Sequence, residues 1–487
     1  MPGYLKQRLA PLTTSGVMSL VLLSACTVLA QSVPMSPEHV WHSSEERQLE
    51  QEAGNLAESR FSINPARTYT LPELVDLAEA HNPATRLSWE RARAQAAKLG
   101  VSRSELYPTL AAAALSDTTR SEADFGNRFD SQFVQDFEIA MELNYTILDF
   151  GGRSGRILTS KAQLLAANFA FNDTHRRVIY EVQEAYYRLL NFMGQEEAAK
   201  VSLSNAQTVQ ESAEQRMANG LATLPDVLEA RSATAQAEYD LQSIVGAEEI
   251  ARGDLATAIG TSPTVAIRIQ PLDQIPTPES VGDTVDDTIR RALQQRPDLL
   301  QQVAEIRAAN GTIKEARSAY YPALTVTVNP AVPSLYGVQS PYAWTHTTGL
   351  TGGLRFSLSW TVFDGGARKN RLAQARADER AAEAEAKVKR NEIADEVWKA
   401  YSNLNTAFRQ RQAAIALLDS AGQSYNAALE SYKYGVRNLL DVTAAQRTLA
   451  QARSADVLAR TQVLTSLADL ASRSADSIRI NDGRNKP

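Results

Sequence analysis

Hydrophobic and polar residues alternate along residues 358–362 (LSWTV) and then give way to a helical pattern. The period of two predicts a β-strand with one apolar face. After Asp364 and two glycines, residues 367–385 are rich in Ala, Glu and Arg, which favours a helix. Residues 143–158 (LNYTILDFGGRSGRIL) show the same succession about 215 residues earlier. The chain therefore contains the same strand-to-helix joint twice.

The alternation continues over longer stretches and separates an apolar face from a polar face. The apolar positions are Phe133, Phe137, Ile139, Met141, Leu143, Tyr145 and Ile147 in the first half, and Leu350, Leu354, Phe356, Leu358, Trp360 and Val362 in the second. Charged, amide and hydroxyl side chains fall on the other face, at Asp136, Glu138, Glu142, Asn144 and Thr146 and at Thr351, Arg355, Ser357, Ser359 and Thr361. Weaker strands are predicted near residues 107–115 and 321–329, and polar loops at 117–132 and 330–349. This pattern is typical of a membrane barrel around water, and a half-buried soluble sheet is the alternative.

Long helices are predicted on either side of these strands. No proline occurs between Pro108 and Pro225 or between Pro341 and Pro487, and interior prolines would break a helix. A helix over residues 152–218 would be roughly 100 Å long at ~1.5 Å per residue. Apolar residues at helical spacing predict a coiled-coil seam in the second half, which consists of Ile393, Val397, Tyr401, Leu404, Phe408, Ile415, Leu418 and Tyr425. A coiled coil without a channel would account for the helices alone.

The two halves of the chain match each other at an offset of 214 or 215 residues. The matched pairs include Tyr107-Pro108 with Tyr321-Pro322, Asp149 with Asp364, and Asn219-Gly220 with Tyr434-Gly435. Each half is predicted to contain an opening helix, two strands, a glycine joint, a long helix, a turn and a return helix. Such self-similarity indicates a tandem duplication.

Four strands in one chain cannot close into a barrel, because closure begins at about eight strands. An open sheet edge in lipid would leave backbone N–H and C=O groups without hydrogen-bond partners. We therefore expect several chains to share one barrel. The long helices follow the strands directly, so they should extend the same tube, with one strand pair and one helical hairpin from each half.

Composition excludes several other classes of protein. The formal net charge of −6 argues against nucleic acid as a partner. The five histidines are scattered without metal-ligand spacing, so no metal site and no cofactor is predicted. No catalytic triad, phosphate-binding glycine loop or paired-carboxylate motif is evident, and no enzymatic activity is expected.

The N-terminus resembles an export signal that ends in a lipobox. Lys6 and Arg8 precede a short apolar segment, and residues 23–26 (LSAC) place Cys26, the single cysteine of the chain, where a bacterial lipoprotein is acylated. Thr27 at the next position favours the outer membrane. Ordinary signal cleavage after Ala30 is the alternative.

The duplicated hairpin unit and its Asp and Gly-Gly joint resemble the TolC family of outer-membrane efflux proteins. The lipobox suggests the lipoprotein branch that includes OprM and the NodT-type proteins. The resemblance covers roughly residues 66–475. It implies an α+β membrane fold in which three chains form a twelve-stranded β-barrel, four strands per chain, continued by a long α-helical barrel across the periplasm.

The resemblance also implies a function and partners. The chain is expected to form the outer-membrane channel of a tripartite efflux system. It would receive cargo from a periplasmic adaptor and an inner-membrane pump of RND or ABC type, as a homotrimer in outer-membrane lipid. A channel for type I protein secretion and a periplasmic coiled-coil adaptor or scaffold are the alternatives.

In that family, residues at the hairpin turns close the periplasmic end of the tunnel. The corresponding residues here are Tyr432, Arg437 and Asp441, with Asp226 at the position that matches Asp441. Ala444 stands where family members often have a second acid. The two aspartates could equally be helix N-terminal residues favoured by the helix dipole.

Glycines and segment boundaries complete the expectations. Gly151, Gly152, Gly365 and Gly366 are expected to let the chain turn at the joints. The predicted segments are a lipoprotein signal peptide (1–25), a leader (26–65), a first repeat (66–261), a crossover (262–283), a second repeat (284–475) and a tail (476–487).

Overall fold

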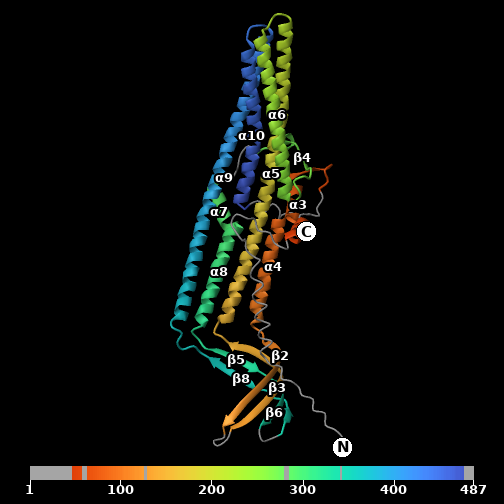
Figure 1. Cartoon of the computed structure of the whole chain (residues 1–487). Coiled ribbons are helices and arrows are strands. Elements are labelled where there is room, and N and C mark those ends of the chain that lie inside the picture. The colour runs from red at the N-terminus through yellow and green to blue at the C-terminus, as the bar shows by residue number, and fades with distance from the viewer. Residues whose placement is uncertain (1–45, 57–62, 125–128, 279–283, 340–342, 476–487) are drawn as a thin grey trace, which may run out of the picture. The chain divides into compact units, whose positions relative to one another are not determined.

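A computed structural model describes residues 46–56, 63–124, 129–278, 284–339 and 343–475 (Figure 1). The chain forms two compact units, residues 1–61 and 62–487. In the first unit, the described part is the helix α2 (Glu46–Leu56). The rest of this section concerns the second unit.

One antiparallel sheet is built from strands of both halves. The strands are β2 (Thr109–Asp124), β3 (Phe129–Leu148), β5 (Ala323–Val328), β6 (Ala331–Gln339), β7 (Thr345–Thr348) and β8 (Leu354–Ser359). β3 pairs with β2 on one side and with β5 and β6 on the other, β8 pairs with β5, and β7 with β6. The sheet is thus four strands wide, as predicted.

The predicted lengths of the strands were wrong in two respects. β2 and β3 extend far into residues 117–132, predicted as a loop, and β6 and β7 occupy much of 330–349. The second strand pair is also interrupted, at Asn329-Pro330 and around Gly352-Gly353. Proline has no N–H for the sheet ladder, and here its carbonyl accepts a hydrogen bond from the Met141 N–H at 2.9 Å.

The register places the apolar positions on one face. Tyr145 lies opposite Val326, which lies opposite Phe356. On the other face, Asn144 lies opposite Thr327, which lies opposite Arg355. The Phe356 side chain is 62% exposed, and Ile139 and Leu358 are exposed as well, so the described residues do not cover the apolar face. This is the pattern that lipid on one side and water on the other require.

The described part of the second unit also contains eight α-helices. They are α3 (Leu71–His81), α4 (Pro83–Ser104), α5 (Gly152–Ala218), α6 (Leu224–Ile259), α7 (Val285–Gln295), α8 (Pro297–Ser318), α9 (Ala367–Lys433) and α10 (Leu439–Arg473). Four of them, α4, α5, α8 and α9, adjoin the sheet. Short strands β1 (Thr68–Tyr69) and β4 (Arg268–Ile269) pair in parallel, and a 3₁₀ turn spans Leu272–Gln274. None of the described helices has an apolar stretch long enough to cross a membrane.

Each opening helix, predicted as one piece, is two helices. Asn82 and Arg296 have extended backbones, with ψ of 128° and 126°, between α3 and α4 and between α7 and α8. A proline follows each of them and disfavours the helical conformation at the preceding residue. The Asn82 side chain then caps α4 by accepting a hydrogen bond from the Ala84 N–H at 2.8 Å.

The helices next to the sheet pack in the order α4, α5, α8, α9, which is the order of the strands they adjoin (Figure 1). α5 and α8 approach most closely at two glycines. A Cβ on Gly155 would lie 2.6 Å from the Glu315 backbone nitrogen, and one on Gly311 would lie 2.6 Å from that of Thr159. These glycines therefore allow backbone contact between the two halves.

Most of the predicted seam of α9 is confirmed. Ile393, Val397 and Leu404 are fully buried. Ile415, however, is 51% exposed, and Ala414 is buried beside it. The seam thus shifts by one residue, because a straight helix drifts relative to a strict heptad.

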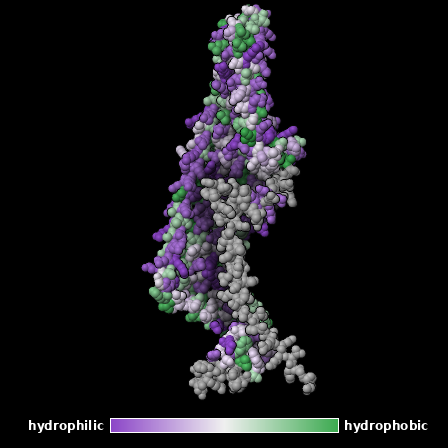
Figure 2. Space-filling model, in the orientation of Figure 1, coloured by the Kyte–Doolittle hydropathy of each residue, from purple (hydrophilic) through white to green (hydrophobic). Residues whose placement is uncertain are grey.

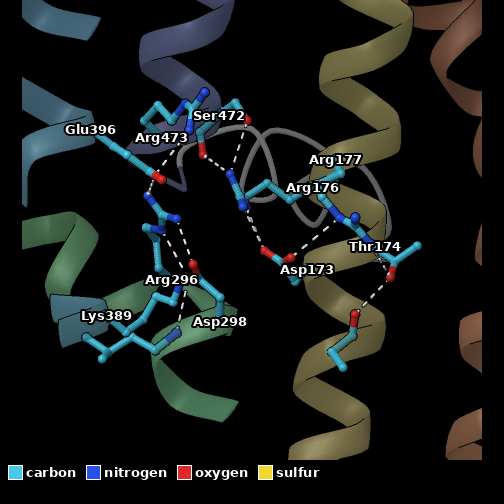
Figure 3. A network of polar contacts seen from close by, with 12 residues as sticks. Asp173, Thr174, Arg176, Arg177, Arg296, Asp298, Lys389, Glu396, Ser472 and Arg473 are labelled. Carbon is cyan, nitrogen blue, oxygen red and sulfur yellow. Dashed lines mark hydrogen bonds and ion pairs between the residues drawn. The ribbon is translucent and has the colours of Figure 1, made fainter. Parts of the chain in front are cut away.

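A buried ionic network joins α5, α8, α9 and α10 (Figure 3). Arg296, only 2% exposed, donates to Asp298 and Glu396, each at 2.7 Å. Arg473 of α10 also contacts Glu396, at 3.1 Å. On α5, Arg176 donates to the Ser472 carbonyl at 3.1 Å. Burial alone would raise the pKa of Asp298, but the hydrogen bonds and charge of Arg296 outweigh it and lower that pKa.

We predict that Arg296→Met strongly destabilises the protein at neutral pH. Removing one partner of a buried ion pair costs about 3–5 kcal/mol. Because the pKa of Asp298 is lowered on folding, its contribution is present above pH ~4 and is lost as the pH falls through the folded-state pKa. Thermal unfolding measured from pH 7 to pH 3 should show that the melting temperature falls less on acidification in the variant than in the wild type.

Arg86→Met is the control for this experiment. It removes an exposed ion pair with Glu90 (2.9 Å) and should change the free energy of unfolding by less than ~1 kcal/mol. Equal unfolding midpoints for the two variants would contradict a stabilising role for the network.

Candidate functional site at the hairpin tip and the joints

The two helical hairpins end in turns of the same construction. α5 ends before Gly220 (φ 72°) and α9 before Gly435 (φ 76°), both in the left-handed conformation that favours glycine. The Leu221 N–H bonds the Arg216 carbonyl at 2.8 Å, and the Val436 N–H bonds the Ser431 carbonyl at 2.9 Å. The turn glycines therefore complete the ends of the long helices.

Both return helices carry an N-terminal cap that involves the predicted aspartates. The Asp226 carboxylate accepts hydrogen bonds from the N–H and the hydroxyl of Thr223, at 2.8 and 2.7 Å. These bonds and the charge of Arg216 lower the pKa of Asp226. In the second hairpin, Asn438 caps the Asp441 N–H at 2.9 Å, so the Asp441 carboxylate stays available for other contacts.

Arg216 links the first hairpin to the second. Its guanidinium lies 4.8 Å from the centre of the Tyr432 ring and donates to the carbonyls of Tyr432 and Lys433, at 3.1 and 3.2 Å. Tyr432 is buried, and its hydroxyl has no hydrogen-bond partner among the described residues. Burial raises the pKa of this hydroxyl, partly offset by Arg216. The two hairpins of one chain are thus joined at the tip.

The predicted pair Arg437 and Asp441 lies on the surface. The two side chains are 4.0 Å apart, and Arg437 is 57% exposed. A surface pair at this distance adds little stability. The tip therefore brings together Tyr432, Asp226 and Arg216, while Arg437 and Asp441 face outward. Exposed apolar and aromatic residues also occur in and next to the two turns, namely Leu221, Leu224, Leu228, Tyr434, Val436 and Leu440. Figure 2 shows hydrophobic residues on the surface at this end of the helices.

Sequence reasoning missed Arg216. The only available signal was a difference between the halves, because Ser431 occupies the matching position in the second hairpin. A cation in the last turn of a helix can bind the free carbonyls there, and Arg216 binds those of the neighbouring hairpin.

The strand–helix joints are also alike in the two halves. The Arg153 N–H donates to the Asp149 carboxylate at 2.5 Å, and the Arg368 N–H donates to that of Asp364 at 3.0 Å. Each arginine side chain returns toward the preceding segment: Arg153 donates to the Ile147 carbonyl at the end of β3, and Arg368 donates to the Val362 carbonyl just after β8. Aspartate and arginine together fix the angle at which the helix leaves the sheet.

The left-handed residues at the joints are Phe150 and Gly151 in the first half, and Gly365 and Gly366 in the second. Gly152 is already the first residue of α5. A Cβ there would lie 2.9 Å from the Asp149 carboxylate, so Gly152 provides a close approach and not a turn. Phe150 stacks on Tyr321 with ring centres 5.2 Å apart. This contact stabilises Phe150 in a left-handed backbone conformation that a residue with a side chain rarely adopts.

Two further expectations concern acylation of Cys26 and the absence of a metal site. Cys26, the predicted acylation site, lies outside the described residues. Within the described ranges, no cluster of three or more His, Cys, Asp or Glu residues could hold a metal ion.

Comparison with known proteins agrees with these features. The sequence pattern of the family described as "Outer membrane efflux protein" matches residues 74–261 and 288–474. The chain belongs to this family. It is an outer-membrane efflux channel that extends into the periplasm, and it is not an enzyme.

This efflux protein is similar to Protein CyaE of Bordetella pertussis, with 28% identity over 396 residues and 81% of each chain covered. It is likewise 28% identical to the outer membrane protein OprJ of Pseudomonas aeruginosa over 414 residues, 82% of each. A crystal structure of a membrane protein from Pseudomonas aeruginosa has the same fold, with a TM-score of 0.73 at 24% identity, and covers 83% of this chain and 93% of that one. Channels of this family form trimers and work with adaptors and pumps.

We predict that Arg216→Gln loosens the tip of this efflux protein and raises its single-channel conductance in planar bilayers. The substitution removes hydrogen bonds from a charged donor, each contributing about 1.5–3 kcal/mol. Hydrogen exchange of residues 428–437 should therefore accelerate at least about tenfold. Arg437→Ser should raise conductance too, with little effect on exchange, because its ion pair is exposed.

Ser431→Ala alters the matching position of the second hairpin and serves as the control. It should leave both measurements unchanged. Arg216→Gln channels with wild-type conductance and wild-type exchange would refute the link between the hairpins.

Proposed function

We propose that three copies of the chain close into one channel, which receives cargo from a periplasmic adaptor and an inner-membrane pump and releases it outside the cell. The observation that carries this proposal is a sheet with an exposed apolar face and unpaired edges. Within the described residues, the outer edges of β2 and of β7 and β8 have no partner strand. In lipid such edges must be paired, and further copies of the same sheet would pair them.

The duplication indicates which surfaces meet between copies. In the chain, α8 packs on α5, the long helix of the other half. By the internal match, α4 corresponds to α8 and α9 corresponds to α5. We infer that α4 of one protomer packs on α9 of the next, as α8 packs on α5.

The residues on these surfaces fit such a contact. Ala97 of α4 matches Gly311, and Asn370 of α9 matches Gly155, the two glycines of the close contact. Along the same faces, Ala94, Val101, Gln374, Ala377 and Ala381 are exposed. Small and apolar residues without a partner in the chain are what an interface between copies needs.

The tip residues are proposed as the periplasmic gate. Tyr432, Asp226 and Arg216 join the hairpins of one chain, and Arg437 and Asp441 are free to contact the adjacent protomer. Three copies of Asp441 around a narrow opening would favour cations. The conductance of the tip variants tests this role.

The N-terminus and the segment boundaries are proposed in line with the sequence. Acylation of Cys26 would anchor the chain in the outer membrane, and the mass of the mature N-terminus distinguishes it from cleavage after Ala30.

We propose the two repeats as 66–261 and 284–475, joined by the crossover 262–283. The joint glycines Gly151, Gly365 and Gly366 are proposed as turn residues, and Gly152 as a packing residue.

We predict that the pair Ala97→Cys and Asn370→Cys yields disulfide-linked trimers under oxidation. A disulfide requires Cα atoms within about 7 Å. Because Gly155 and Gly311 are in close contact between α5 and α8, we expect the matching residues Asn370 and Ala97 to come within this distance between protomers. Non-reducing electrophoresis of outer-membrane fractions measures the product.

The matched control is Ala96→Cys with Asn370→Cys. Ala96 lies about 100° around α4 and should give little linkage. A ladder of equal strength from both pairs, or no linkage in trimers isolated by size, would refute the inferred interface.

We also predict that Val436→Cys, 78% exposed at the tip, captures a periplasmic adaptor when a thiol cross-linker is added to cells. Capture is expected because an adaptor must contact the tunnel at its periplasmic end. The cross-linked product is identified by mass spectrometry, and Ile250→Cys, also exposed but away from the tip, should not give it.

The identity of the captured protein distinguishes the functions. An adaptor of a drug or metal pump supports efflux, whereas an adaptor of a secretion ATPase indicates protein cargo. Capture only of other copies of this chain would contradict the proposed assembly.

A further inference from the structure

A hollow of about 750 Å³ lies between α8 and α9 and is strongly basic. It is lined by Lys314 and Arg317 of α8, Arg376 and Arg380 of α9, and a single carboxylate, Glu379. Three positive charges are therefore in excess.

These four cations lack the carboxylate partners that Arg156 of α5 has. No ion pair involves any of them within the described residues, although Arg380 donates to the Arg376 carbonyl at 3.2 Å. Arg156, by contrast, pairs with both Glu105 and Glu315. Like charges three and four residues apart on a helix repel each other, so an anion would stabilise this surface.

The hollow is on the side of the helices that faces away from the lumen. Ala367 and Arg371 of α9 line a different hollow, together with Asp364 of the joint and the polar face of the sheet. At 100° per residue, Arg376 and Arg380 lie roughly 140–180° away from Ala367 and Arg371 around α9. In the proposed trimer, the basic hollow therefore opens to the outside of the tube.

Aromatic residues indicate the depth of the hollow relative to the membrane. Exposed Tyr321, Trp360 and Phe363 lie where the strands meet the helices, and aromatic residues of this kind mark the membrane–water interface. Arg317 lies in the last turn of α8, four residues before Tyr321. The side chains of Arg376 and Arg380 tilt toward the N-terminus of α9 and hence toward the sheet.

The duplicate groove between α4 and α5 is less basic. Gly100 and Leu165 stand where the second half has Lys314 and Arg380, and only Arg103 and Lys161 are cations at the matching positions. The duplicate groove thus has two cations where the hollow between α8 and α9 has four, and Leu164 stands in place of Glu379, so the net excess of positive charge is larger by one in the second half.

We propose that the hollow between α8 and α9 binds the phosphate headgroup of an anionic phospholipid in the periplasmic leaflet of the outer membrane. Arg and Lys attract anionic headgroups at this depth, and arginine binds phosphate through two parallel hydrogen bonds. The orientation of the hollow rests on the proposed trimer.

The test is native mass spectrometry of the purified full-length protein with phosphatidylglycerol or phosphatidylcholine. The wild type should bind phosphatidylglycerol at least tenfold more tightly. The double variant Arg317→Gln with Arg376→Gln should lose about thirtyfold in affinity for phosphatidylglycerol. Arg103→Gln with Lys161→Gln removes two charges from the duplicate groove and should retain the preference.

Three outcomes would overturn the lipid site. They are a retained preference in the first double variant, an equal loss in the second, and displacement of the lipid by millimolar inorganic phosphate. The same spectra report the mass of the assembly. Trimers without preferential lipid binding contradict only this inference, whereas the absence of trimers contradicts the proposed function.

Discussion

The structure depends on one constraint, which is that every backbone polar group of a sheet in lipid needs a partner. A four-stranded sheet with an exposed apolar face cannot meet this requirement alone. In the proposed trimer, the edges of this sheet, β2 on one side and β7 with β8 on the other, pair with those of the adjacent copies, because each half of the chain repeats the same strand pair. Association would then be a condition of folding in the membrane and not an addition to it.

The helices follow from the same arrangement. Since α4, α5, α8 and α9 keep the order of the strands, a closed sheet would impose a closed ring of helices below it. The joints transmit this order through matched pairs, Asp149 with Arg153 and Asp364 with Arg368. The halves nevertheless differ at the tip, where Arg216 of the first hairpin is matched by Ser431 of the second. A trimer of such chains would have threefold symmetry with six similar but unequal hairpins.

Much of this was predictable from sequence because it rests on local patterns. Alternation gave the faces of the sheet, missing prolines gave the long helices, and the internal match gave the turns at Gly220 and Gly435. The predictions were wrong where a contact distant in sequence or a single residue determines the local structure. Pro83 and Pro297 divide the opening helices, Pro330 interrupts a strand, and Phe150 takes a left-handed conformation beside Tyr321. Arg216 was missed because its partners, the carbonyls of Tyr432 and Lys433, are more than 200 residues away in sequence.

α5 and α9 are each 67 residues long. Since both begin at the sheet and end at the tip, a heptad inserted into one hairpin alone would move its tip about 10 Å beyond the other and open the contact between Arg216 and Tyr432. The depth of the tunnel can thus change only by matched insertions or deletions in both halves. Because of the duplication, the length of the channel across the periplasm is constrained, and length changes in one repeat require matching changes in the other.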